Sequence, residues 1–174
     1  SVHWRPVRAA YFIRIPNVGD RIVTSIVEAI IGCPTVRVTD LNQPHLLALG
    51  STMSAATPHS CVWGTGVMHP SIGIGQAVAD RIFAVRGKLT FAALRDAGLQ
   101  LAEIPIGDPG LLAPTLLGVK RADRPKFQIG LVPHYVDRLD LCFQHFASDP
   151  RVVLLDVHQE PRSFLAQKIG RAHV

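Results

Sequence analysis

The sequence predicts an α/β protein built on a Rossmann-like parallel sheet, and two observations support this fold class. Aliphatic residues and glycine are plentiful, whereas aromatic residues make up only 6% of the 174 residues. This composition is typical of parallel strands that are buried on both faces. Short aliphatic runs also alternate along the chain with segments whose apolar residues recur at helical spacing, which favours consecutive βα units.

The first expected βα unit opens with the aliphatic run Ala9–Ile15, which predicts a buried strand. The run breaks at Asn17–Asp20, and apolar residues then recur on one helical face from Ile22 to Ile31. Either Asn17 or Asp20 is placed to cap the N-terminus of this helix.

Similar patterns predict the remaining elements. Further strands are expected at 35–39, 46–50, 61–63, 81–85 and 104–106, with a helix at 89–97. A second series follows, with strands at 127–132 and 151–157 and helices at 139–146 and from 161.

The chain divides into an N-terminal Rossmann-like domain at 1–117, a charged linker at 118–126, and the start of a truncated second domain at 127–167. Residues 168–174 (KIGRAHV) match a translated sequencing adapter and are interpreted as a non-native tail. Removing the two basic residues of that tail from the 18 in the chain leaves 16 basic against 13 acidic residues, a net charge of +3.

Composition excludes several classes of function. The basic residues form no block of the kind that binds nucleic acid. No apolar stretch reaches the roughly 20 residues that span a bilayer. Three widely spaced cysteines without a CxxC pair indicate reduced thiols in a cytoplasmic protein. The histidines lack metal-ligand spacing such as HExxH, so no metal is predicted.

Several loops that follow expected strands contain glycine, which lets backbone amides approach an anion closely. Neither the GxGxxG dinucleotide fingerprint nor a Walker A sequence is present, which disfavours NAD and ATP sites. The alternative for each loop is that its glycine only permits a sharp turn.

Five of these segments, in this order, resemble the motifs of the polysaccharide pyruvyl transferase family. They are Asn17–Asp20 (NVGD), Val62–Gly66 (VWGTG), Val85–Thr90 (VRGKLT), Ile106–Leu112 (IGDPGLL) and Ile129–Asp137 (IGLVPHYVD). The resemblance covers about residues 10 to 167. Lys88 stands where the family usually has proline, and Gly110 where it usually has alanine.

The resemblance implies a two-domain enzyme of glycosyltransferase-B-like (GT-B-like) architecture. Such enzymes transfer pyruvate from phosphoenolpyruvate to two hydroxyls of a sugar, forming a ketal, in exopolysaccharide or cell-wall polysaccharide biosynthesis. Phosphoenolpyruvate is then a donor substrate, and no cofactor is implied. The saccharide acceptors are assembled at the inner face of the membrane, some of them lipid-linked, and a net charge of +3 is compatible with peripheral attachment there.

The resemblance and the chemistry together give the candidate site residues. Arg86 is the candidate contact for the anionic donor, and His134 is the candidate acid, base or phosphate contact. The candidate substrate-binding residues are Asn17, Gly19, Asp20, Gly64, Gly66, Gly87, Asp108, Tyr135 and Asp137. Structural alternatives remain open: an ion pair that braces a helix for Arg86, capping for Asn17 and Asp20, a turn for Asp108, and a structural role for His134.

A later S-S-x-H-G-like segment of the family, implicated in donor binding, has no counterpart in residues 1–167. The chain as given is therefore expected to lack turnover. Two other functions remain open, namely a nucleotide-sugar glycosyltransferase of the same fold and a non-catalytic binding domain or fragment.

Overall fold

A five-stranded parallel sheet forms the centre of the first unit in the computed structural model, which describes residues 5–11, 17–69, 73–124 and 126–171. Its strands are β1 (Val7–Ala9), β2 (Thr35–Arg37), β3 (His45–Leu47), β4 (Ser60–Trp63) and β5 (Ile82–Ala84). They lie in the order β2-β1-β3-β4-β5, and every neighbouring pair is parallel. The predicted α/β class with a parallel sheet is confirmed.

The first strand is shorter and begins earlier than predicted. A strand was expected over Ala9–Ile15, whereas β1 ends at Ala9, where it pairs with Leu46 of β3. Residues 12–16 lie outside the described residues. The start of the aliphatic run is buried as expected, and Ala10 belongs to the core although it lies beyond the last residue of β1.

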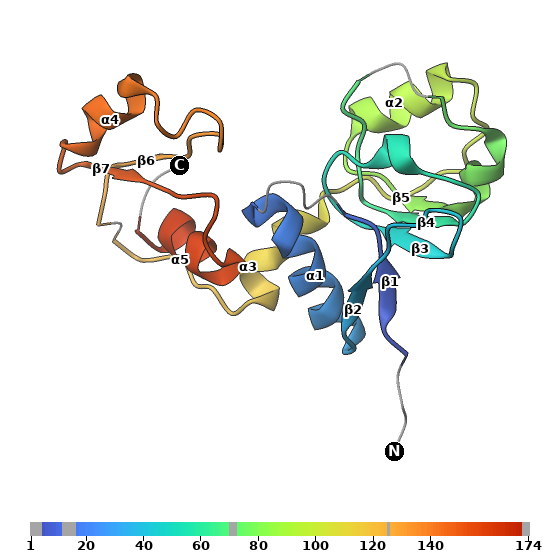
Figure 1. Ribbon diagram of the computed structural model, residues 1–174, viewed down its shortest axis with the longest axis horizontal. Helices are drawn as coiled ribbons and strands as arrows, with labels where there is room; N and C mark the ends of the chain where they lie inside the picture. The colour runs from blue at the N-terminus through green and yellow to red at the C-terminus, as the bar shows by residue number, and fades with distance from the viewer. Residues whose placement is uncertain (1–4, 12–16, 70–72, 125, 172–174) are drawn as a thin grey trace.

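Helices cover both faces of this sheet (Figure 1). On one face lie α1 (Val18–Ile31) and the short α3 (Ala113–Leu116). On the other lie α2 (Lys88–Asp96) and the 3₁₀ helix η2 (Gln76–Arg81). Successive side chains of a strand point to opposite faces of the sheet. Leu46 therefore packs on the face covered by α1, and Leu47 packs on the face covered by α2.

The strand order creates a topological switch point. β1 lies between β2 and β3, and the chain leaves β1 through α1 toward β2 before crossing to β3 on the other side. Two short 3₁₀ helices lie at this edge: η1 (Met53–Ala55) follows β3, and η3 (Pro109–Leu112) follows Ile106, which forms an isolated parallel bridge with Val85. In open α/β sheets, ligands bind outside the carboxyl ends of the strands at such a point.

A second unit contains two parallel strands, β6 (Ile129–Leu131) and β7 (Val152–Leu154), with α4 (Leu141–Ala147) against β7. Between the two units, α5 (Pro161–Arg171) packs against α1, and its Leu165 enters the same core as Val23 (Figure 1). The helix includes residues 168–171 of the expected non-native tail. Within the described ranges, no helix is both long enough and apolar enough to cross a membrane.

Candidate functional site

A cleft of about 280 Å³ lies at the switch point, where loops from β1, β3 and β5 meet. It contains five of the residues predicted from sequence: Asn17, Gly19, Asp20, Arg86 and Asp108. The rest of its lining is Tyr11, Ile22, Val23, Leu49, Gly50, Thr52 and Gly110. Residues as distant in sequence as 17 and 108 thus share one cleft because parallel strands deliver their loops to the same edge.

Asn17 caps α1 and holds Asp20 in place. Its side-chain Oδ1 accepts a hydrogen bond from the Asp20 amide at 3.2 Å, and its Nδ2 donates to Asp20 Oδ2 at 2.6 Å. The predicted cap is therefore confirmed, with Asn17 as the capping residue. Burial raises the pKa of the Asp20 carboxyl above its usual 3.8, and the hydrogen bond from Asn17 partly opposes that rise.

The first turn of α1 leaves one backbone donor for a ligand. The Val18 amide donates to the Val157 carbonyl at 2.6 Å, and the Asp20 amide is taken by Asn17. The Gly19 amide has no acceptor among the residues that the structure describes. A free N–H at a helix N-terminus favours an anion or the oxygen of a hydroxyl group.

Arg86 supplies the cation of the cleft. Its Nη1 donates to Ser51 Oγ at 3.1 Å, and its backbone amide donates to the Thr65 carbonyl at 3.2 Å. A Cβ on Gly66 would lie 2.7 Å from Arg86 Nε, so Gly66 provides the room for the guanidinium. No carboxylate of the described ranges lies within ion-pair distance of Arg86, so the bracing ion pair is not observed.

Asp108 and Gly64 organise the far side of the cleft. Asp108 caps η3, with Oδ1 accepting from the Gly110 amide at 2.8 Å, so the turn role left open for it is observed. Gly64 has φ +91°, and a Cβ there would overlap the ring of Pro109. Gly64 and Gly66 therefore do not line the cleft, but they leave room for Pro109 and Arg86, respectively. Gly87 does not line the cleft either and is the N-cap residue of α2.

Sequence reasoning missed the loop Gly50–Thr52, which follows β3. The Gly66 amide donates to the Gly50 carbonyl at 2.8 Å, and the Thr52 and Thr65 hydroxyls lie 2.9 Å apart. These bonds tie the loop after β3 to the loop after β4, and Ser51 holds Arg86. A Gly-Ser-Thr sequence directly after an aliphatic strand was the available signal.

His134, Tyr135 and Asp137 do not line this cleft. They follow β6, where His134 and Asp137 are exposed and the rings of His134 and Tyr135 lie 4.1 Å apart. The structure therefore does not bring the two candidate catalytic residues, Arg86 and His134, into one cavity. The strands that precede these two residues belong to different sheets.

A separate cavity of about 330 Å³ lies beside β6 and β7. Its lining residues are Pro133, Arg138, Leu139, Leu154, Leu155, Asp156 and Val157. One of its lining residues, Val157, accepts through its carbonyl a hydrogen bond from the Val18 amide at the start of α1. The two units therefore meet where both have their strand-end loops.

The charges of the cleft limit its ligands. One guanidinium, Arg86, faces two carboxylates, Asp20 and Asp108, together with the Asn17 amide. Carboxylates and amides pair readily with hydroxyl groups, whereas a single cation offsets little of a multiply charged anion. In the described part of the chain, no three His, Cys, Asp or Glu residues gather where they could hold a metal ion.

Comparison with known proteins finds a distant relative of this chain. No protein-family model matches the sequence, and no solved structure matches it significantly. A protein of Acanthamoeba polyphaga mimivirus, described as uncharacterized protein L143, is 28% identical to this chain over an alignment of 176 positions that includes 97% of the chain. The chain spans 60% of the length of that relative, whose description names no activity.

Proposed function

We propose that this chain forms the sugar-binding half of a pyruvyl transferase with GT-B-like architecture. The observation that carries the proposal is the cleft at the switch point. Three of the five segments that resemble the family, those containing Asn17, Arg86 and Asp108, contribute side chains to it. The acceptor is a saccharide, the donor is phosphoenolpyruvate, and the setting is the cytoplasmic face of the cell membrane.

The residues have distinct roles in this proposal. The Asp20 and Asp108 carboxylates accept hydrogen bonds from sugar hydroxyls, and the Gly19 amide donates to a sugar oxygen. Arg86 contacts the carboxylate or phosphate of phosphoenolpyruvate at the border between donor and acceptor. The remaining negative charge of the donor needs further cations, and His134 is a candidate on the side of the two-stranded unit.

The reaction needs one proton donor and one leaving group. Protonation of the donor methylene carbon gives a methyl group and an oxocarbenium-like carbon, which the first sugar hydroxyl attacks with loss of its proton. Phosphate then leaves with its bonding electron pair, and the second hydroxyl adds to close the ketal and releases the second proton. Asp20, whose pKa is raised by burial, is suited to receive a proton from a sugar hydroxyl.

The test has a binding stage and a turnover stage. Binding of a panel of glycosides and of phosphoenolpyruvate is measured first by NMR titration. Arg86→Gln should abolish donor binding and Asp20→Asn should weaken glycoside binding. The matched control is Arg95→Gln, which alters an exposed arginine of α2 that does not line the cleft.

Turnover is then measured in a polypeptide that continues the reading frame past Gln167, with phosphate release and ketal formation as the readouts. Nucleotide-linked and lipid-linked sugars are supplied as acceptors. If neither product forms with any acceptor, the proposal fails. Release of a nucleoside diphosphate without phosphoenolpyruvate would establish the glycosyltransferase alternative. Ketal formation by residues 1–167 alone would refute the division of the site into two halves.

A further inference from the structure

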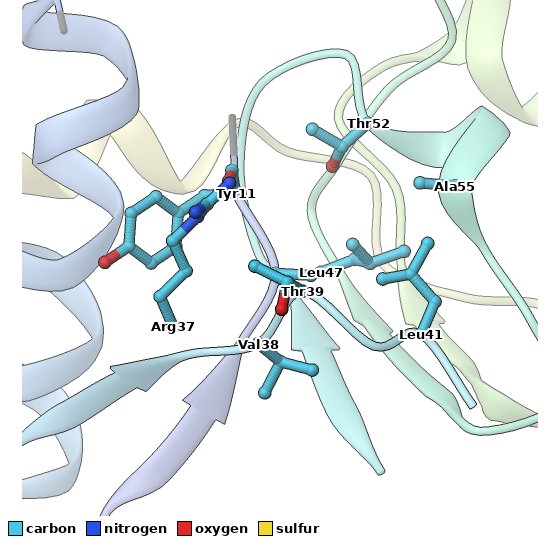
Figure 2. A pocket seen from close by; sticks show the side chains of 9 residues that line it. Tyr11, Arg37, Val38, Thr39, Leu41, Leu47, Thr52 and Ala55 are labelled. Carbon is cyan, nitrogen blue, oxygen red and sulfur yellow. The ribbon is translucent and has the colours of Figure 1, made fainter. Parts of the chain in front are cut away.

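A second cavity, of about 220 Å³, adjoins the cleft at the carboxyl ends of β1, β2 and β3 (Figure 2). Tyr11 and Thr52 line both cavities, so the two are neighbours. None of the residues predicted from sequence lines this second cavity. It nevertheless occupies the same switch-point edge of the sheet, where α/β proteins bind ligands.

The floor of this cavity is apolar. Ala10, Val38 and Leu47 are buried, and Leu41 and Ala55 complete the apolar surface. Figure 2 shows Arg37 and Tyr11 together at one side, with Leu41 and Leu47 at the other. Such a surface suits a planar or aliphatic group rather than a bare sugar.

Among the residues that the structure describes, Arg37 is the one cation that lines this cavity. Its Nε donates to the Tyr11 carbonyl at 3.2 Å, and its terminal nitrogens make no hydrogen bond to a described residue, so they are available to a ligand. Within the described ranges no carboxylate forms an ion pair with Arg37, and no carboxylate lines the cavity. The adjoining cleft, by contrast, carries two carboxylates. An anion would therefore be favoured at Arg37 and disfavoured between Asp20 and Asp108.

We propose that this cavity is a phosphate subsite, which binds the phosphate ester of a glycosyl phosphate whose sugar lies in the cleft. Arg37 contacts the phosphate, and the apolar floor receives the group esterified to it. The identity of the sugar-binding cleft rests on the proposed function, whereas the anion subsite is testable by itself. A nucleotide and a prenyl lipid would present the same phosphate ester, and the experiment separates them.

Phenyl phosphate is the probe for the subsite, because it joins a phosphate monoester to a planar apolar group. In NMR or calorimetric titrations of the full chain, Arg37→Gln should weaken its binding at least about tenfold. Ala55→Phe should also weaken binding, since it fills the cavity and leaves the charge unchanged. Arg95→Gln, at an exposed arginine that lines neither cavity, should leave the affinity within about twofold. Equal affinities for wild type and Arg37→Gln, or no binding of phenyl phosphate at millimolar concentration, would overturn the subsite.

A second comparison separates this inference from the proposed function. Hexose 1-phosphates, uridine diphosphate hexoses and prenyl-phosphate hexoses are compared with neutral methyl hexosides. Binding is measured with this chain, and pyruvyl transfer is measured with the longer polypeptide used for the turnover test. If phenyl phosphate binding depends on Arg37 but no ketal forms, the subsite stands and the proposed function fails. If neutral glycosides react as well as glycosyl phosphates and Arg37→Gln leaves KM unchanged, the proposed function stands and the subsite fails.

Discussion

The five-stranded unit and the two-stranded unit use the same βα pattern but bury very different fractions of their apolar side chains. In the five-stranded unit, Leu47, Val62 and Leu94 are fully buried between the sheet and its helices. In the two-stranded unit, none of the described residues of α4 is buried, and Leu139 and Leu141 are 70% and 80% exposed. Parallel strands are stable when both faces are covered, and two strands with one helix provide little cover.

This difference extends to the candidate site. The residues of the cleft are held by bonds between separate loops, such as Arg86 to Ser51 and Gly66 to Gly50. His134 and Asp137, on the two-stranded unit, lie on an exposed turn. α5 is the exception in the second half of the chain, because its Leu165 is buried against α1. A well-ordered site therefore depends on a core large enough to fix several loops at once.

The largest expected effect tests the difference in burial directly. Leu94→Ala should lower the free energy of unfolding by about 2–5 kcal/mol, because it removes a fully buried side chain and leaves a cavity. The same change at exposed Leu141 should stay within about 0.5 kcal/mol. Urea unfolding of both variants gives the comparison. Similar losses in the two variants would show that the two-stranded unit has a core of its own.

Hydrogen exchange should resolve the two units without mutation. Amides of β4 should be protected at least about tenfold more than amides of β6, which corresponds to about 1.4 kcal/mol in opening free energy. The reason is that β4 lies inside the sheet between β3 and β5, whereas β6 pairs only with β7 among the described strands. Equal protection would mean that the two units open together.

Asn17→Ala tests the contact between the units. Loss of the cap of α1 should cost about 1 kcal/mol in the free energy of unfolding. Exchange in α5 should also rise, because the neighbouring Val18 amide binds the Val157 carbonyl and α5 packs on α1. Asn17→Ser, which keeps an oxygen acceptor at the cap, is the matched control and should recover most of the loss. An unchanged rate of hydrogen exchange in α5 would show that the contact between the two units does not depend on the cap of α1.

The smallest effects are the pH dependences of two aspartates, which should have opposite signs. Burial raises the pKa of Asp20 in the folded state above the usual 3.8. Protonated Asp20 therefore favours the folded state below pH 3.8, and this stabilisation is lost as the pH rises through the folded-state pKa. The pKa of Asp149 is lowered to about 2 by its hydrogen bonds and ion pair with Arg151. Ionised Asp149 therefore stabilises the folded state above pH 3.8, and this stabilisation is lost as the pH falls toward about 2.

Melting temperatures of Asp20→Asn and Asp149→Asn, followed from neutral pH to about pH 2, measure these dependences. On acidification, wild type should gain stability relative to Asp20→Asn and lose its advantage over Asp149→Asn. Changes of the same sign in both comparisons would contradict the environments described for the two carboxyl groups.

Local patterns in the sequence determined much of the fold. Helical spacing and the cap at Asn17 predicted α1, and the periodic run from 89 to 97 predicted α2 within one residue at each end. Short aliphatic runs located β2 to β7, although most strands are shorter than the runs that indicated them. Such features depend on neighbouring residues, which is why one sequence suffices to find them.

Only the tertiary structure decided the strand order, and with it which loops meet. It placed β1 between β2 and β3, which brought Asn17, Arg86 and Asp108 into one cleft and left His134 outside it. It also placed Arg37 beside an apolar cavity, although the sequence indicated only a strand there. Pairing order and cavity shape arise from contacts between residues far apart in the chain, and no local pattern records them.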